Sequence, residues 1–241
     1  GRFVLELEGE RFEDAIPSRQ ARLVVAYLVL RRGRPVDRGR LTQLLWPEGS
    51  PPGADTTLRG LVFRLRKALG AGRLEGRSEL SLRLPENAWI DVEVARGSAH
   101  QAESAIAQQD WRRAWLPSRV AAGIAGTEFM PGHGGEWVAG QRTELAELRL
   151  RALECVAETG LNLGGTELAA AERAGRSLIA AAPYRESGYL HLMHALERGD
   201  NVAEALRVYD DLRRLLRNEL GVSPGARIQQ LHERLLGVSA S

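Results

Sequence analysis

Lysine is nearly absent from this sequence: Lys67 is the only one among its 33 basic residues, and the others are arginine. The 241 residues also include a single cysteine, Cys155, and only 5% are aromatic. One cysteine excludes an internal disulfide, and no apolar run approaches the roughly 18 residues that a membrane-spanning helix needs. We therefore expect a cytoplasmic protein that does not contact the membrane.

The shortage of lysine and cysteine also argues against catalysis. A nucleotide-hydrolysing P-loop requires Gly-Lys-Ser/Thr, whereas Lys67 stands in the sequence Arg-Lys-Ala. Cys155 has no partner base in view and is expected to be a buried, inert thiol. His191 and His194 lie three residues apart but lack a further ligand at metal-binding spacing. We expect no enzymatic activity, no cofactor and no metal.

Charge is distributed unevenly along the chain. Residues 1–90 contain 16 basic and 11 acidic residues, whereas residues 91–241 contain 17 and 20. The total net charge is only +2, so the first part is basic and the second is mildly acidic. Because GC-rich codons favour arginine, alanine and glycine, the position of the arginines is more informative than their number. The asymmetry predicts two domains with different partners.

Residues 1–91 show the pattern of a winged helix-turn-helix domain. Short alternating stretches predict a small sheet, and three helical periodicities follow before a hairpin. In this order of elements, the third helix enters the major groove of DNA and the hairpin touches the neighbouring backbone. The expected elements are strands at 3–7 and near 12, a helix from the Ser18 cap to Gly33, a helix from the Asp37 cap to Pro47, a helix at 55–69, and a hairpin around 76–78.

The expected third helix has one apolar side and one basic side. At 100° per residue, Leu58, Val62 and Leu65 share the apolar side, and Phe63 lies on the opposite side. Four cations and two hydroxyl groups surround Phe63 there. Such a face predicts phosphate contacts that position the helix and guanidinium contacts that read guanine. The candidate DNA-binding residues are Thr56, Thr57, Arg59, Gly60, Phe63, Arg64, Arg66 and Lys67 on the helix, with Arg73 and Arg77 on the hairpin.

This face also allows a simpler interpretation. A basic helix is common in an arginine-rich composition, so the same residues are compatible with a solvated surface that binds nothing. The small Gly60 and the outward Phe63 favour a surface that another molecule approaches. Phe63 would either touch a thymine methyl group or pack on the hairpin.

Three segments of this region carry family motifs: Leu-Leu-Trp-Pro at 44–47, Thr-Leu-Arg at 57–59 and Phe-Arg-Leu-Arg-Lys-Ala-Leu-Gly at 63–70. They resemble the OmpR-type winged helix of the SARP family, the bacterial antibiotic regulatory proteins. That family usually has histidine at the position of Leu61 and serine at that of Phe63, both facing or flanking the DNA groove. The resemblance implies a DNA-binding domain that departs from its relatives where base contacts would be made.

Residues 92–241 are expected to form an all-α domain of tetratricopeptide type. A closing strand at 89–92 would end the first domain, with the boundary near Asp91. Gly164 and Gly199 lie 35 residues apart, close to the period of a tetratricopeptide repeat, so helix pairs should stack into a short superhelix. The fold class is therefore mainly α with a small β component. The expected helices are 94–109, 111–124, 136–160, 166–181, 186–198, 202–220 and 225–236.

Short motifs continue in order through this second part, among them Pro-Tyr-Arg-Glu at 183–186 and Glu-Leu-Gly-Val-Ser-Pro at 219–224. They resemble the bacterial transcriptional activation domain that follows the winged helix in SARP proteins. One departure is a Gly/Ala-rich stretch at 121–135. The resemblance implies an activator whose protomers occupy direct repeats in promoter DNA and recruit RNA polymerase through its sigma and alpha subunits. The partners implied are double-stranded DNA, RNA polymerase and a second copy of the chain.

Two other functions stay open. The apolar Leu61 and Phe63 are compatible with a protein-interaction adaptor whose winged helix does not bind DNA. The start at Gly1, without methionine, is compatible with a regulatory module of a larger multidomain protein, since this domain pair is often fused to others.

Overall fold

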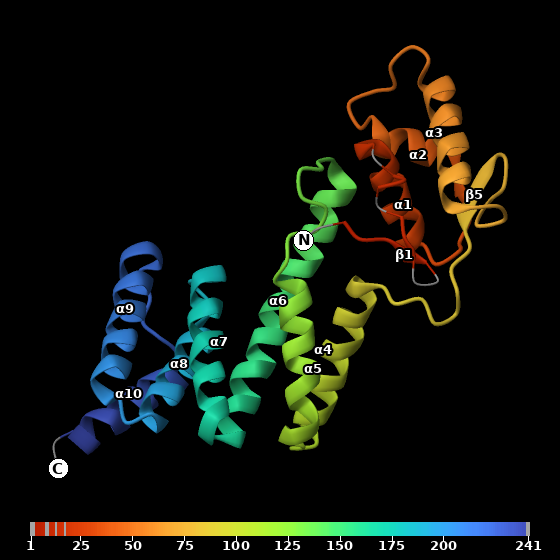
Figure 1. Cartoon of the computed structure of the whole chain (residues 1–241). Helices are drawn as coiled ribbons and strands as arrows, with labels where there is room; N and C mark the ends of the chain where they lie inside the picture. Colours follow the sequence, from red (N-terminus) through yellow and green to blue (C-terminus); the bar gives the residue numbers. More distant parts are fainter. Residues whose placement is uncertain (1–2, 8–9, 13, 17, 240–241) are drawn as a thin grey trace. The chain divides into compact units, whose positions relative to one another are not determined.

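The computed structural model describes residues 3–7, 10–12, 14–16 and 18–239, and it divides into two compact units (Figure 1). Unit 1 comprises Gly1–Ile90 and Thr127–Glu144, and unit 2 comprises Asp91–Gly126 and Leu145–Ser241. The fold is mainly helical with short antiparallel strands, as expected. Division at residue 91 into two separate domains stays a prediction, and the assignment of 127–144 to unit 1 was not anticipated.

Unit 1 begins with short strands and helices whose starts are set by side-chain caps. The Ser18 hydroxyl accepts a hydrogen bond from the Ala21 N–H at 3.0 Å, and the Asp37 carboxylate accepts one from the Arg40 N–H at 2.8 Å. Both predicted N-caps are confirmed. The elements are β1 (Glu6–Leu7), β2 (Glu10–Arg11), α1 (Arg19–Leu30), β3 (Val36–Asp37), α2 (Arg38–Leu45), α3 (Ala54–Leu69), β4 (Leu74–Glu75) and β5 (Glu79–Leu82).

The predicted hairpin is part of a three-stranded antiparallel sheet with the order β3-β5-β4. Leu80 of β5 lies opposite Val36 of β3, and Leu82 lies opposite Leu74 of β4. These four side chains are buried in the core of unit 1. Strand β3 was not predicted, because two residues are too few to show an alternating pattern.

Helix α3 packs its apolar side into the same core. Leu58, Val62 and Leu65 are at most 2% exposed, as their spacing predicts. Leu61 is also buried, at 1% exposure. Its expected position facing or flanking a DNA groove was therefore wrong, since this leucine belongs to the hydrophobic core rather than to the outer face.

Residues 127–144 pack against α1 and α2. The Trp137 ring meets the rings of Tyr27 and Phe129 edge to face, with centroids 5.0 and 5.6 Å apart. The Arg142 guanidinium holds the preceding loop by donating hydrogen bonds to the carbonyls of Phe129, Met130 and His133 at 2.9, 2.9 and 3.1 Å. The later half of the Gly/Ala-rich stretch thus forms an ordered part of unit 1.

The strand expected at 89–92 is absent from the described chain, because a helix begins at Asp91 instead. Val92, Ala95 and Ala99 are buried at helical spacing, and this packing overrides the strand-like composition of the short segment. Trp89, at the start of the expected strand, is 71% exposed.

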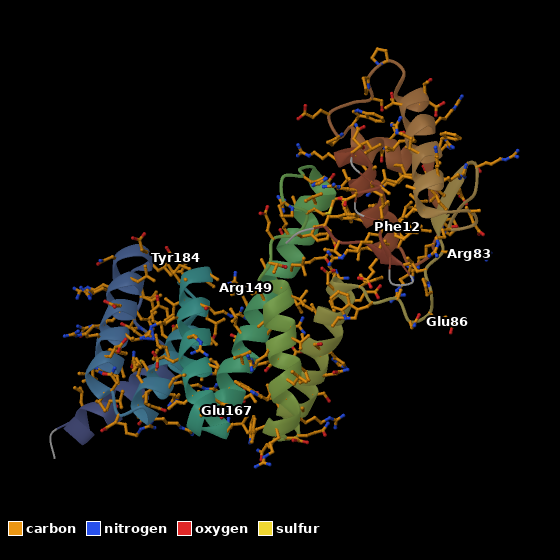
Figure 2. The ribbon with its side chains drawn as sticks, in the orientation of Figure 1. Phe12, Arg83, Glu86, Arg149, Glu167 and Tyr184 are labelled. Carbon is orange, nitrogen blue, oxygen red and sulfur yellow. The ribbon has the colours of Figure 1, made fainter. Side chains whose placement is uncertain are left out.

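Unit 2 contains helices that follow one another as neighbours (Figure 1). Figure 2 shows Tyr184 in the turn after the helix that ends at Ala181, where its ring is about half exposed. The predicted bounds of α8 and α9 are confirmed, and the others differ by up to three residues. The helices are α4 (Asp91–Ala107), α5 (Trp111–Ala125), α6 (Glu136–Leu163), α7 (Leu168–Ala181), α8 (Glu186–Arg198), α9 (Val202–Leu220) and α10 (Ala226–Ser239), with a short 3-10 helix at Gly165–Glu167.

The helix contacts in unit 2 depend on small side chains. A Cβ atom at Gly175 of α7 would lie 2.9 Å from the Leu192 Cβ of α8, and one at Gly188 of α8 would lie 2.9 Å from the Leu178 Cβ of α7. These two glycines permit the close crossing of α7 and α8. Alanines play a similar part at the first pair, where Ala95, Ala99, Ala102 and Ala105 of α4 and Ala114, Ala121 and Ala125 of α5 are buried.

Replacement of Trp137 by alanine should destabilise unit 1. We expect a loss of about 3 kcal/mol in the free energy of unfolding, because the partly buried ring leaves a cavity beside Tyr27 and Phe129. Urea denaturation measures the loss. Trp89→Ala is the matched control, since that ring is mostly exposed, and equal losses in the two variants would contradict the proposed importance of the 127–144 packing.

Candidate nucleic-acid interface

The outward side of α3 carries most of the predicted DNA-binding residues. Phe63 is 70% exposed, so it does not pack on the hairpin. Asp55 is the only acidic residue of the helix, and it forms an ion pair with Arg59 in which both side chains are exposed. Such an exposed pair contributes little stability and is easily broken by a competing ligand. Thr56, Thr57, Arg59, Phe63, Arg64 and Lys67 are exposed, and Gly60 and Arg66 are partly exposed.

Gly60 keeps the middle of this face low. A Cβ atom there would have only the Arg64 guanidinium nearby, at 3.8 Å, so the fold leaves room for a larger residue. The absence of a side chain is therefore not required by packing within unit 1. It leaves the helix backbone accessible between Thr56 and Phe63.

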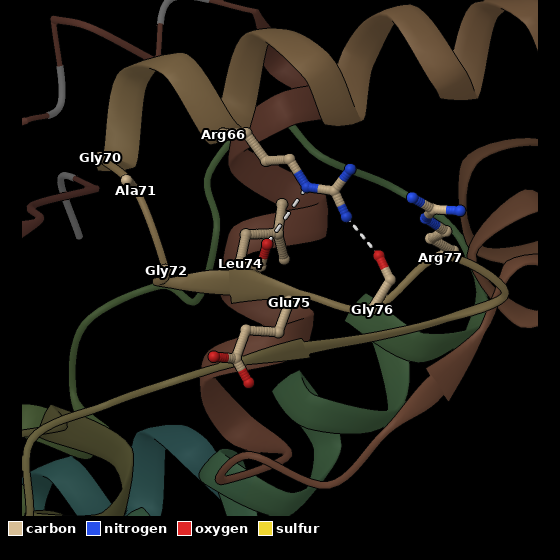
Figure 3. Close-up of a pocket in the computed structure, with 8 residues that line it drawn as sticks. All are labelled: Arg66, Gly70, Ala71, Gly72, Leu74, Glu75, Gly76 and Arg77. Atoms are coloured by element: carbon tan, nitrogen blue, oxygen red, sulfur yellow. Dashed lines mark hydrogen bonds between the residues drawn. The ribbon is translucent and has the colours of Figure 1, made fainter.

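Arg66 connects α3 to the hairpin. Its Nε–H donates a hydrogen bond to the Leu74 carbonyl at 3.2 Å, and its terminal N–H donates to the Gly76 carbonyl (Figure 3). Gly76 has a φ of +91°, and a Cβ there would overlap the Glu79 carbonyl, so this turn requires glycine. The guanidinium of Arg66 thus positions the hairpin, although the sequence suggested a DNA contact for it.

Arg38 supports the hairpin from its other side, a role that the sequence analysis missed. Its Nε–H donates to the Arg77 carbonyl at 2.6 Å, and its backbone N–H donates to the Ser78 carbonyl at 3.3 Å. The Arg77 side chain itself is exposed at the turn. The spacing of Arg38 from Arg77 in the sequence offers no local signal for this contact, because it depends on the pairing of β3 with β5.

An open depression of about 410 Å³ lies between the end of α3 and the hairpin. Arg66 and Arg77 form part of its wall, and the backbone of 70–72 forms another part (Figure 3). Glu75 also lines it (Figure 3), but this carboxylate pairs with the Arg83 guanidinium at 2.8 Å. Arg73 is only partly exposed, and its carbonyl accepts the Arg83 N–H at 2.8 Å.

The polar groups of unit 2 that drew attention in the sequence do not form a reactive site. Cys155 is buried as expected, and burial together with nearby carboxylates raises the pKa of its thiol to about 12, which favours the protonated form at neutral pH. Asp210 and Asp211 pair with Arg213 and Arg214 at 3.1 and 2.5 Å on an exposed face. In the part of the chain that the structure describes, no group of three potential metal ligands comes together.

His191 is another titratable group of this unit with a shifted pKa. Burial lowers its pKa, the Glu154 carboxylate opposes the shift, and the neighbouring His194 adds to it. The neutral imidazole is therefore favoured in the folded chain. The carboxylate of Glu154 also accepts a hydrogen bond from the Ser187 hydroxyl at 2.6 Å and forms an ion pair with Arg185 at 3.1 Å, so its charge is already compensated by other partners.

Comparison with known proteins places the chain among transcription regulators. Residues 90–236 match the family described as Bacterial transcriptional activator domain. The chain is 36% identical over 219 residues to the regulatory protein AfsR of Streptomyces griseus, covering 91% of this chain and 22% of AfsR. It is 30% identical over 232 residues to the regulatory protein DnrI of Streptomyces peucetius, covering 91% of this chain and 84% of DnrI.

A solved structure shares this fold. It is described as Mycobacterium tuberculosis EmbR in complex with low affinity phosphopeptide, and it matches with a TM-score of 0.80 at 26% identity. The match covers 97% of this chain and 62% of EmbR. The chain thus spans less than a quarter of AfsR and less than two thirds of EmbR.

These matches define a transcription regulator built around a bacterial transcriptional activator domain. The chain belongs to the SARP family, whose named relatives are regulators rather than enzymes. Among the described helices, none is long and apolar enough to cross a bilayer.

Replacement of Arg66 by alanine should loosen the hairpin. We expect amide hydrogen exchange in β4 and β5 to accelerate about tenfold, because two charge-assisted hydrogen bonds are lost and each contributes roughly 1.5–3 kcal/mol before solvent screening. Lys67→Ala removes the neighbouring exposed cation and serves as control. Equal exchange rates in the Arg66 variant and the wild type would refute the positioning role.

Acidification should weaken unit 2 through His191. The unfolded chain binds a proton near pH 6.5, whereas the folded chain resists it, so the free energy of unfolding falls as the pH drops below about 6.5, by at most about 1.4 kcal/mol per pH unit. Glu158, whose pKa is raised by burial and by Glu154, acts in the opposite direction. Urea titrations between pH 7.5 and 5.5 should show a shallower dependence for His191→Gln than for the wild type.

Proposed function

We propose that unit 1 is a winged helix that binds double-stranded promoter DNA, with α3 as the recognition helix and the β4–β5 hairpin as the wing. The observation that carries the proposal is the outward side of α3, where Phe63, Arg64 and Lys67 are all exposed while the opposite side is buried. A helix with this division fits the major groove, and its cations supply phosphate contacts. The SARP relatives support the assignment.

The residues of this face have different tasks in the proposal. Lys67 and Arg59 contact phosphates, and Arg64 is placed to reach a base edge in the groove. Phe63 meets a thymine methyl group, and Gly60 lets the helix backbone approach closely. Thr56 donates a hydroxyl hydrogen bond near the helix start, and Thr57 would do so by giving up the bond that its hydroxyl donates to the Gly53 carbonyl at 3.2 Å. In the wing, Arg77 contacts the backbone and Arg73 lies at the base of the strand, whereas Arg66 and Arg38 hold the wing in place.

We further propose that the chain activates transcription from these sites. By likeness to the SARP family, two protomers occupy direct repeats side by side, and the assembly recruits RNA polymerase through its sigma and alpha subunits. The regulator names of the relatives support activation at promoters. A cytoplasmic location agrees with this role.

Selection of bound sites from random duplex DNA tests the proposal. The wild type should yield a consensus, and Phe63→Ser should shift it at a single base position because the thymine contact is lost. On the selected duplex, affinity should fall with salt with a logarithmic slope of about −0.9 for each neutralised phosphate. Lys67→Ala should reduce the magnitude of that slope by about one.

The control is Arg207→Ala, which removes an exposed cation from α9 and should leave the slope unchanged. Failure of the whole chain to bind any duplex at roughly 50 mM salt would exclude the proposal. The protein-interaction adaptor would then be the better description. The adaptor hypothesis rested on the apolar residues Leu61 and Phe63. Leu61 no longer supports it, because this leucine lies in the core, where an apolar side chain is expected.

A further inference from the structure

Helix α5 carries an exposed leucine that packing within the chain does not explain. Leu116 is 68% exposed, whereas Ala114, Ser118 and Ala121 of the same helix are fully buried. The buried side of α5 is therefore already defined by small residues, and Leu116 lies away from it. A large apolar side chain on a polar surface marks a place where another molecule binds.

Arginines surround Leu116 on this face. Arg112, Arg113 and Arg119 lie three or four residues from it, which places them next to it on the helix surface, and all three are exposed. The helix contains no acidic residue. Asp110, which precedes it, uses its carboxylate to accept the Arg113 backbone N–H at 3.1 Å. The face is thus strongly basic although unit 2 as a whole is mildly acidic.

Two further features shape this surface. The Arg119 guanidinium lies over the Trp115 ring, 5.3 Å from its centroid, which orients that cation. Gly123 follows one turn later, and a Cβ atom there would have nothing within 4 Å, so the surface is low beside Arg119. Beyond this surface, at the far end of α5, the Arg149 Nε of α6 lies 3.8 Å from where a Gly126 Cβ would be (Figure 2).

We propose that this face of α5 binds an acidic amphipathic helix of a partner protein. Leu116 would be the apolar anchor, and the arginines would pair with carboxylates on both sides of the partner's apolar stripe. Protein interfaces commonly combine an apolar centre with arginine at its edge. Gly123 would let the partner helix approach closely, as apolar helix faces do in recognition grooves.

The chemistry of the face favours this occupant over two others. A phosphate backbone would satisfy the arginines but would leave Leu116 without an apolar partner. A second copy of this chain is a poor match because many carboxylates of unit 2 are already paired within the chain. These pairs are Glu103 with Arg151, Glu172 with Arg176, Glu197 with Arg234, Asp210 with Arg213, and Asp211 with Arg214.

The test is a selection from a displayed library of 16-residue helical peptides, using the full chain as bait. Sequences that also bind the Arg112→Glu/Arg113→Glu variant are discarded. We expect the retained peptides to be rich in Asp and Glu and to carry an apolar residue at helical spacing. One such peptide, labelled and titrated by fluorescence anisotropy, should lose affinity at least tenfold with the double variant and with Leu116→Ser, and should bind more weakly as salt increases.

A matched control comes from the chain itself. Arg213→Glu/Arg214→Glu changes the same number of charges on α9, where both arginines pair with aspartates, and should leave peptide affinity unchanged. Thermal unfolding of each variant confirms that the fold is intact, since all the altered side chains are exposed. Duplex DNA affinity and sedimentation are measured in parallel, so this proposal and the DNA-binding proposal can fail separately.

Four results would overturn the proposal. Recovery of no peptide, or of peptides without acidic enrichment, would show that the face has no such specificity. An equal loss of peptide affinity in the α9 control variant would show that the effect depends on the overall charge of the chain and not on this face. A loss of duplex affinity in the α5 variant, with no peptide bound, would assign the face to nucleic acid. A change in sedimentation in the α5 variant would assign it to a second copy.

Discussion

The burial of one side of α3 is the constraint on which the rest of unit 1 depends. Leu58, Leu61, Val62, Leu65 and Leu69 insert into a common core with α1 and β5, and five buried side chains allow only one rotation of the helix about its axis. That rotation alone decides that Phe63, Arg64 and Lys67 point outward. It also brings Arg66 over the hairpin. The face proposed to bind DNA is thus a consequence of core packing, and Leu61 belongs to the core rather than to that face.

Arginine serves two physical roles in this chain, and only geometry separates them. Arg38, Arg66 and Arg142 donate to backbone carbonyls of the hairpin and of the 129–133 loop, and the guanidinium groups of Arg66 and Arg142 reach two and three such oxygens at once. Arg64 and Arg112 instead extend into solvent. A composition in which nearly every cation is arginine hides this difference. Lysine could not replace Arg38, Arg66 or Arg142, because a single ammonium group lacks the planar set of donors of a guanidinium. At these loops arginine is therefore required by the structure, whatever the reason for its general excess in the composition.

The parts that the sequence revealed were those governed by local rules. The caps at Ser18 and Asp37 and the bounds of α8 and α9 follow from interactions within a few residues, and the outward side of α3 was readable from the spacing of its apolar residues. Other features join segments that lie far apart in the chain, so no local periodicity predicts them. They are the pairing of strand β3, the packing of Trp137 on Tyr27, and the hydrogen bond from Arg38 to the hairpin. At 89–92, a short apolar run was compatible with either strand or helix, and burial at helical spacing decided the outcome.

Phe63 and Leu116 are both exposed apolar side chains among arginines, but their other neighbours differ. Each is a large apolar side chain, about 70% exposed, with arginines within one helical turn. Around Phe63 the other neighbours are Gly60 and threonine hydroxyls, which suit the mixed polar edge of a base pair and a single methyl group. Around Leu116 the neighbours are arginines and a partly buried tryptophan, with no hydroxyl at the adjacent positions. Removing water from Leu116 is favourable only if a partner contributes an apolar side chain, and the arginines are then satisfied only if the same partner contributes carboxylates. The two units therefore use similar residues to favour different classes of ligand, because the polar groups beside the apolar residue determine what can replace water there.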